Sequence, residues 1–204
     1  GGFWNGQVMI KSLKEKSQDS IRVFHKIDMS PVVKIAIDKD ENFAITGTLC
    51  GNVHIYNIDS NQPSLWREHV DLYDHTSEIT DISINSVQYI FMTVSRDCYA
   101  NIYTLPDCKL VNSIKLKSPP SKCLISNSPL PCIVLYFNTE KKIDVYSING
   151  HFIISKNLNS EIVQWKIFTN YLFADYLMYT CKDYQKITIA SLPELSEVTK
   201  NSPA

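Results

Sequence analysis

Residues 75–103 have the sequence HTSEITDISINSVQYIFMTVSRDCYANIY, and this stretch decides the fold that we expect. Its first apolar run, Ile79, Ile82 and Ile84, is interrupted by polar residues, a pattern typical of a half-buried strand. Further strands are predicted on either side of a polar turn and again beyond Tyr103, and none of these segments has a helical period. The stretch therefore predicts a sheet of four short antiparallel strands, with residues 79–84, 89–94, 100–103 and 109–114 as the strands and 95–97 as the turn.

The third strand of this unit recurs along the chain at a nearly constant interval. Similar apolar runs end at residues 11, 56, 103, 146 and 190, which are 45, 47, 43 and 44 residues apart. A four-stranded blade of a β-propeller takes about 40–45 residues, so the period indicates successive blades. We expect blade units at about 1–29, 30–71, 72–117, 118–158 and 159–198, followed by a frayed tail at 199–204.

The predicted fold class is all-β, a propeller of about four and a half four-stranded blades. The first unit has room only for its last two strands, and an open arc of blades would leave two apolar faces without a neighbour. We therefore expect the chain to be part of a seven-bladed ring, with further blades on its N-terminal side. A five-bladed ring, completed by an N-terminal strand, is the alternative.

Composition narrows the class of function. The net charge of −1 gives no general electrostatic reason to bind nucleic acid or an anionic membrane. The six cysteines include no Cys-x-x-Cys pair, which predicts free thiols in a reducing compartment and no zinc site. No signal peptide opens the sequence, and no apolar run approaches the roughly 20 residues of a membrane span, so we expect a cytoplasmic protein without a membrane span.

One group of polar residues has the composition of a catalytic triad. His75, Thr93 or Ser95, and Asp97 offer an imidazole, a hydroxyl and a carboxylate, and Tyr103 lies six residues after the aspartate. A carboxylate that holds a histidine, which in turn holds a hydroxyl, also satisfies buried polar groups inside a packed sheet. We expect the structural role, because such networks stabilise blades.

This spacing resembles the WD-repeat family, in which a His, a Ser or Thr, an Asp and a Trp form a hydrogen-bonded tetrad in each blade. The other units depart from that pattern. Asn5, Cys50 and Glu140 stand at the position of the turn aspartate, and the tryptophan is replaced throughout by Tyr, Lys or Ala. The resemblance therefore implies a divergent WD-repeat propeller.

Two phrases, Gly1–Val8 and Thr93–Cys98, are also similar to the C-terminal propeller of beige-type (BEACH-domain) proteins. This resemblance implies a cytosolic scaffold of vesicle trafficking and protein sorting, peripheral on endomembranes, with an upstream BEACH region as a partner within the same chain. The alternative is a propeller subunit of another multiprotein assembly, such as a coat, a pore or a ubiquitin-ligase adaptor. A propeller hydrolase or lyase is the remaining hypothesis, and no paired carboxylates favour it.

No chemistry beyond protein binding is expected. The six glycines form no phosphate-binding loop, the histidines and cysteines form no metal-ligand cluster, and no cofactor or enzymatic activity is predicted. The expected partners are proteins or peptides, and not nucleic acid. Trp and Arg are frequent interface hot spots, so the candidate contact residues are Trp4, Arg96, Trp66 and Arg67, against a plain packing or ion-pair role for each.

The densest basic region lies in the third and fourth units and contains Lys109, Lys115, Lys117, Lys122, Lys141 and Lys142. Lysines on an edge strand prevent unwanted strand pairing, which is one explanation for the region. The functional alternative is contact with an acidic partner or a membrane surface.

Overall fold

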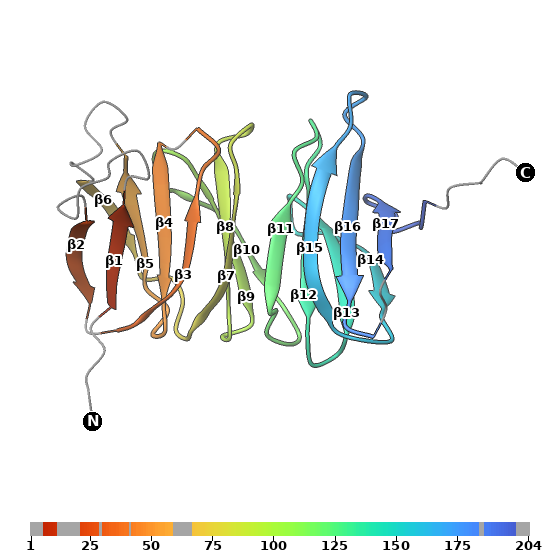
Figure 1. The fold of residues 1–204 in the computed structure, drawn as a ribbon, viewed down its shortest axis with the longest axis horizontal. Helices are drawn as coiled ribbons and strands as arrows, with labels where there is room; N and C mark the ends of the chain where they lie inside the picture. Colours follow the sequence, from red (N-terminus) through yellow and green to blue (C-terminus); the bar gives the residue numbers. More distant parts are fainter. Residues whose placement is uncertain are drawn as a thin grey trace, which may run out of the picture.

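The structure is a computed structural model, and it describes residues 6–11, 21–28, 30–40, 42–58, 67–183 and 186–198. Every regular element in these ranges is a β-strand, and the strands form five antiparallel sheets that follow one another along the chain (Figure 1). We name the sheets blades 1 to 5. The all-β class and the succession of blades predicted from the sequence are confirmed.

Blades 2, 3 and 4 each contain four strands in sequential order, whereas blade 1 has two described strands and blade 5 has three. Blade 1 contains β1 (Gly6–Lys11) and β2 (Ile21–Asp28), and blade 2 contains β3 (Val32–Ile37), β4 (Phe43–Thr48), β5 (Val53–Asn57) and β6 (Arg67–Leu72). Blade 3 contains β7 (Ile79–Asn85), β8 (Ile90–Ser95), β9 (Tyr99–Thr104) and β10 (Leu110–Lys115). Blade 4 contains β11 (Lys122–Ile125), β12 (Cys132–Phe137), β13 (Lys142–Ser147) and β14 (Phe152–Asn157), and blade 5 contains β15 (Ile162–Thr169), β16 (Asp175–Cys181) and β17 (Ile187–Ser191).

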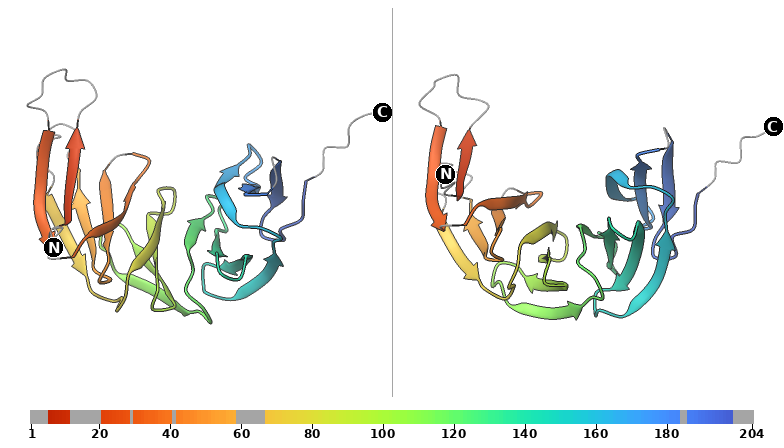
Figure 2. Two further views of the ribbon diagram at one scale, coloured as in Figure 1. Left: turned by 60° about the horizontal axis from the view of Figure 1, so that its bottom comes forward. Right: turned by 90° about the horizontal axis from the view of Figure 1, so that it is seen from below.

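Seen from below, the blades are arranged along an open arc (Figure 2). The first strands, such as β7 and β11, lie on its concave side and contact each other, and the fourth strands β6, β10 and β14 form the convex outer wall. The second strands are inner strands of their sheets, and neighbouring blades pack on their faces, which explains why they are apolar. All six residues of β12, Cys-Ile-Val-Leu-Tyr-Phe, are buried, because both of its faces are covered.

The apolar core lies between the blades and not within any one of them. One cluster joins blades 3 and 4 through residues such as Met92, Ile102 and Leu135. A second joins blades 2 and 3 through Ile55 and Phe91, and a third joins blades 4 and 5. Each blade is therefore stable only together with its neighbours, as expected for repeats that stack.

Polar bonds also join blades 3 and 4. Alternate side chains of β7 reach the backbone at β11: Asp81 accepts from the Cys123 N–H at 3.0 Å, Ser83 accepts from Ile125 N–H at 3.0 Å, and Asn85 donates to the Ser126 carbonyl at 2.7 Å. Each of these bonds satisfies a backbone group that would otherwise face a neighbouring blade without a partner. The two blades are thus held in one register.

Backbone conformation ends strands in blades 2 and 5. Gly51, in the turn between β4 and β5, has φ of +101°, a left-handed conformation that glycine adopts freely. Among the described residues, blade 5 has no regular fourth strand at 194–198. That segment makes one isolated bridge, between Ala190 and Glu197, and Leu195, with φ of +54°, turns the chain before it.

Candidate functional site

The polar residues singled out in blade 3 meet inside the sheet. His75 Nδ1 is 2.9 Å from Asp97 Oδ2, and His75 Nε2 is 2.8 Å from the Thr93 hydroxyl. His75 is 4% exposed and Thr93 is fully buried. Because Nδ1 faces a carboxylate, it carries the proton, and Nε2 accepts from Thr93. We call His75, Thr93, Asp97 and Tyr103 the His75 network.

The turn geometry holds Asp97 in place. Its carboxylate accepts from the backbone N–H groups of Thr76 at 3.0 Å and Tyr99 at 3.0 Å. Burial alone would raise the pKa of Asp97, but the hydrogen bonds from Thr76, His75 and Tyr99 outweigh it and lower that pKa. Asp97 is therefore charged at neutral pH and anchors the segment before β7 to the turn after β8.

Ser95 and Tyr103 complete this arrangement through groups outside the predicted set. The Ser95 hydroxyl donates to the Ser77 carbonyl at 2.9 Å and accepts from the Asp97 N–H at 3.2 Å. The Tyr103 hydroxyl donates to Asp74 Oδ2 at 3.1 Å, and the Tyr103 ring stacks on Phe91 with centroids 4.9 Å apart. Asp74 was not among the predicted residues, although it directly precedes His75 and lies in the same unit as Tyr103.

A second polar pairing repeats in blades 2, 3 and 4. The residue three places before the last residue of each third strand bonds to the residue directly opposite on the fourth strand. The pairs are His54 Nδ1 with Asp71 Oδ1, Ser113 Oγ with Asn101 Oδ1, and Ser155 Oγ with Asp144 Oδ1, each at 2.6 Å. We call these the outer pairs. They tie the outer-wall strand of a blade to the rest of its sheet.

Two of the four partner-binding candidates lie among the described residues. Arg96 is exposed and forms an ion pair with Glu78, next to the start of β7. Arg67 begins β6, while Trp4 and Trp66 lie outside the described residues. A contact role for each of the four residues stays a prediction.

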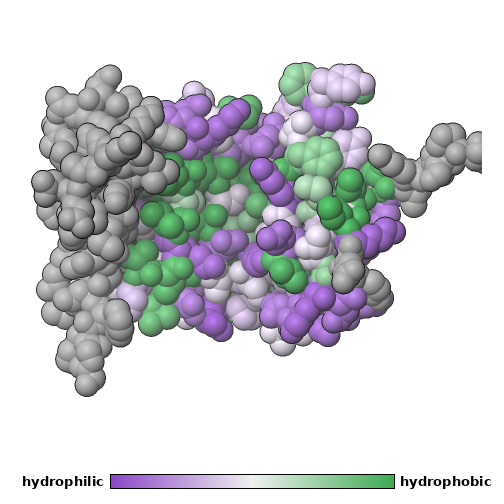
Figure 3. All heavy atoms as spheres, in the orientation of Figure 1, coloured by the Kyte–Doolittle hydropathy of each residue, from purple (hydrophilic) through white to green (hydrophobic). Residues whose placement is uncertain are grey.

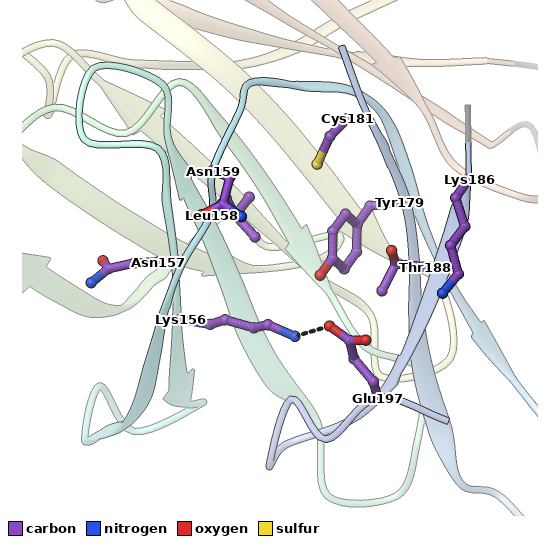
Figure 4. A pocket seen from close by; sticks show the side chains of 9 residues that line it. All are labelled: Lys156, Asn157, Leu158, Asn159, Tyr179, Cys181, Lys186, Thr188 and Glu197. Atoms are coloured by element: carbon purple, nitrogen blue, oxygen red, sulfur yellow. Dashed lines mark hydrogen bonds and ion pairs between the residues drawn. The ribbon is translucent and has the colours of Figure 1, made fainter. Parts of the chain in front are cut away.

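A cleft of about 300 Å³ lies between the outer strand of blade 4 and blade 5 (Figure 4). Lys156 Nζ and Glu197 Oε1 form an ion pair 2.8 Å long across it, and the Tyr179 ring and Thr188 line its wall beside Lys186. This pair joins the segment after β17 to blade 4. The ion pair thus holds the segment after β17 in position, and the charges of Lys156 and Glu197 are already paired with each other.

No group of three or more His, Cys, Asp or Glu side chains in the described ranges is placed to hold a metal ion. The same part of the chain contains no helix that is long and apolar enough to cross a membrane.

Solved structures with a similar arrangement of strands identify the fold. A chain of the mitotic checkpoint complex superimposes with a TM-score of 0.75 over 94% of this chain and 59% of that chain, at 13% sequence identity. The U3-55K structure superimposes with a TM-score of 0.66 over 83% of this chain and 51% of that chain, at 9% identity. The fold is that of a WD-repeat-like β-propeller.

Sequence comparisons are sparser. No protein-family model matches the propeller. Human DDB1- and CUL4-associated factor 4 is 24% identical over 108 residues, which are 52% of this chain and 20% of that protein. The chain thus spans about a fifth of this curated relative and between half and three fifths of the two solved chains.

Proposed function

We propose that this propeller is a non-enzymatic protein-interaction scaffold. The observation that carries the proposal is the state of the His75 network, whose order of groups, Asp97 to His75 to Thr93, is that of a Ser-His-Asp triad. A nucleophile must reach a substrate carbonyl, but Thr93 is fully buried and its hydroxyl is bonded to His75. We infer that Asp97, His75 and Thr93 hold strands of blade 3 together. Partners would then bind at the surface of the propeller.

Within this class, we infer a role as an adaptor subunit that associates with DDB1 and CUL4. The inference rests on the similarity to human DDB1- and CUL4-associated factor 4 over about half of the chain. It corresponds to the ubiquitin-ligase adaptor among the sequence-based alternatives. The free state of all six cysteines supports a reducing compartment, so the proposed location is the cytoplasm.

The beige-type scaffold of vesicle trafficking stays a prediction from two short phrases. Gly1–Val8 lies mostly outside the described residues. Thr93–Cys98 is the segment that supplies Thr93, Ser95 and Asp97 to the contacts around His75, so its sequence has a structural reason in any WD-like blade. Peripheral association with endomembranes belongs to this second hypothesis.

Equilibrium binding separates the two hypotheses. Purified chain would be titrated by biolayer interferometry against immobilised DDB1 and, in a parallel channel, against an isolated BEACH domain. The adaptor role predicts saturable binding to DDB1 with a Kd of about 10 μM or tighter, which corresponds to at least roughly 7 kcal/mol. Binding to the BEACH domain without binding to DDB1 would favour the beige-type scaffold, and a chain that binds neither protein contradicts both specific roles.

A further inference from the structure

A groove of about 510 Å³ lies on the outer wall of the propeller, where β10 of blade 3 meets β13 and β14 of blade 4. Figure 2 shows these outer strands on the convex side of the arc. The volume is in the range of sites that hold a small ligand or a few residues of a peptide. The groove is distinct from the His75 network and from the cleft beside Glu197.

One rim of the groove is positively charged. Lys115 and Lys117 flank Leu116, whose side chain is buried, and both lysine side chains are exposed. Neither lysine forms an ion pair among the described residues. The lining contains three lysines and one aspartate, so it carries two net positive charges.

The third lysine is fixed and has its charge balanced inside the groove. Lys142 Nζ lies 2.5 Å from Glu140 and 3.4 Å from Asp144, and it sits 4.7 Å from the centre of the Phe137 ring. Burial alone would lower the pKa of Lys142, but its bonds and charge interactions with Glu140 and Asp144 outweigh burial and raise it. The uncompensated charge of the groove therefore belongs to Lys115 and Lys117.

Aromatic side chains form the opposite side. Tyr146 and Phe152 pack edge to face with ring centroids 5.6 Å apart, and Phe152 is 57% exposed. An exposed phenylalanine beside a recessed tyrosine offers an apolar contact for a side chain that enters the groove. The groove thus combines free positive charge with an aromatic wall.

From this combination we propose that the groove docks an acidic peptide segment of a partner protein, with an aromatic or aliphatic side chain against Phe152 and carboxylates against Lys115 and Lys117. The proposal rests on the proposed function and specifies the chemistry of its partner. A peptide fits better than a membrane, because the aromatic wall is part of a groove between two blades, whereas a flat anionic surface would meet the exposed lysines alone.

The test uses fluorescein-labelled random copolymer of glutamate and tyrosine as a probe of this chemistry, with anisotropy measured on the full chain. Copolymers of lysine and tyrosine and of glutamate alone serve as the reversed-charge and charge-only probes. The variant Lys115→Glu/Lys117→Glu reverses both free charges. Lys39→Glu/Lys182→Glu is the matched control, because it changes net charge equally at two exposed lysines outside the groove.

We expect the glutamate–tyrosine copolymer to bind, and the binding to weaken with added salt. The groove variant should bind at least tenfold more weakly, while the control variant stays within about twofold of the native chain. Phe152→Ala should remove the preference for glutamate–tyrosine copolymer over polyglutamate. Equal losses in the two double variants would overturn the proposal, since the effect would then be one of net charge.

Two further outcomes also overturn it: no binding of the copolymer, or binding through Lys115 and Lys117 to phosphatidylserine vesicles in place of the copolymer. Titration of the same variants against DDB1 keeps the two proposals apart. If DDB1 binds and the copolymer does not, the groove inference fails and the adaptor role stands. If the copolymer binds through the groove and DDB1 does not, the adaptor role fails and the groove inference stands.

Discussion

At the scale of single residues, two half-buried aspartates of blade 3 have pKa values shifted in opposite directions. The Asp97 carboxylate is stabilised as an anion by three hydrogen-bond partners, whereas burial raises the pKa of Asp81, and the Cys123 N–H and nearby lysines only partly offset this. Asp97 belongs to the His75 network, and Asp81 bonds to the backbone of blade 4. Their environments show that the polar residues of this blade hold strands and neighbouring blades together.

The raised pKa of Asp81 predicts a specific pH dependence. Because the folded state binds this proton more tightly than the unfolded state, its contribution to stability falls as pH rises from 3.8 through the folded pKa. Asp81→Asn removes that titration, so its free energy of unfolding relative to the native chain should increase over this window and level off above it. Urea unfolding at several pH values measures the difference, and a difference that is constant with pH would contradict the assignment.

At the scale of elements, the outer pairs are the features that could not be predicted from the sequence. Ser113 and Asn101 are 12 residues apart, and their contact depends on the register of β9 with β10 across a bulge between Leu110 and Asn112. His54 is 1% exposed and bonded to Asp71, 17 residues further along the chain. Period and composition predict strands, but they do not fix which polar residues face each other across them.

The Asn101–Ser113 pair should show measurable coupling. In a double-mutant cycle of Asn101→Ala and Ser113→Ala, we expect a coupling energy of about 0.5–1.5 kcal/mol, because each single change leaves a polar partner without its bond. Chemical unfolding of the four proteins gives this value. Costs that add within about 0.3 kcal/mol would show that the pair contributes nothing to the attachment of β10.

The turn at Gly51 joins blade 2 to the segment before β7. A Cβ at this position would lie 2.8 Å from the His75 carbonyl oxygen and 2.8 Å from that of Ser77, in a backbone with φ of +101°. Gly51→Ala should therefore lower the free energy of unfolding by roughly 2–4 kcal/mol, through strain and displacement of the His75 segment. Thermal or urea unfolding tests this, with Lys39→Ala, an exposed turn residue of the same blade, expected to change stability by less than about 0.5 kcal/mol.

At the scale of the whole molecule, some strands of blades 2 and 5 expose apolar side chains, in contrast to the fully buried strand β12. Ile35 and Ile37 of β3 are each 52% exposed, and Phe168 and Ile187 of blade 5 are 38% and 57% exposed. Figure 3 shows apolar residues gathered on the concave face over β3 and over the end of blade 5. The sequence-based expectation of further blades in a seven-bladed ring stays a prediction.

This difference predicts a gradient of local stability. Hydrogen exchange followed by mass spectrometry should be slowest in β8 and β12, because both faces of these strands are covered and blades 3 and 4 share the bonds from β7 to β11. Exchange should be faster in β3 and β15, where several side chains are exposed. Slower exchange in β15 than in β12 would contradict the inferred position of the core.

The period of about 45 residues was sufficient to predict the fold, because each blade repeats the same strand pattern. The His75 network was also visible, since His75, Thr93 and Asp97 fall within one repeat and close to two turns. The groove could not be predicted from the sequence, because it combines Lys115 and Lys117 of one blade with Tyr146 and Phe152 of the next. Sites between repeats depend on packing that a one-dimensional pattern does not specify.

The central claim is that the triad-like residues have a structural role. The most direct test compares the free energy of unfolding of Asp97→Asn with that of Asp107→Asn at pH 7. Asp107 is an exposed aspartate whose ion pair with Lys109 is 3.5 Å long, so its substitution should cost less than about 0.5 kcal/mol. Asp97→Asn should cost roughly 2–4 kcal/mol, because it disrupts bonds to His75 and to two backbone N–H groups. Equal stability of the two variants would contradict the structural role and return the Asp97–His75–Thr93 group to candidacy as a catalytic site.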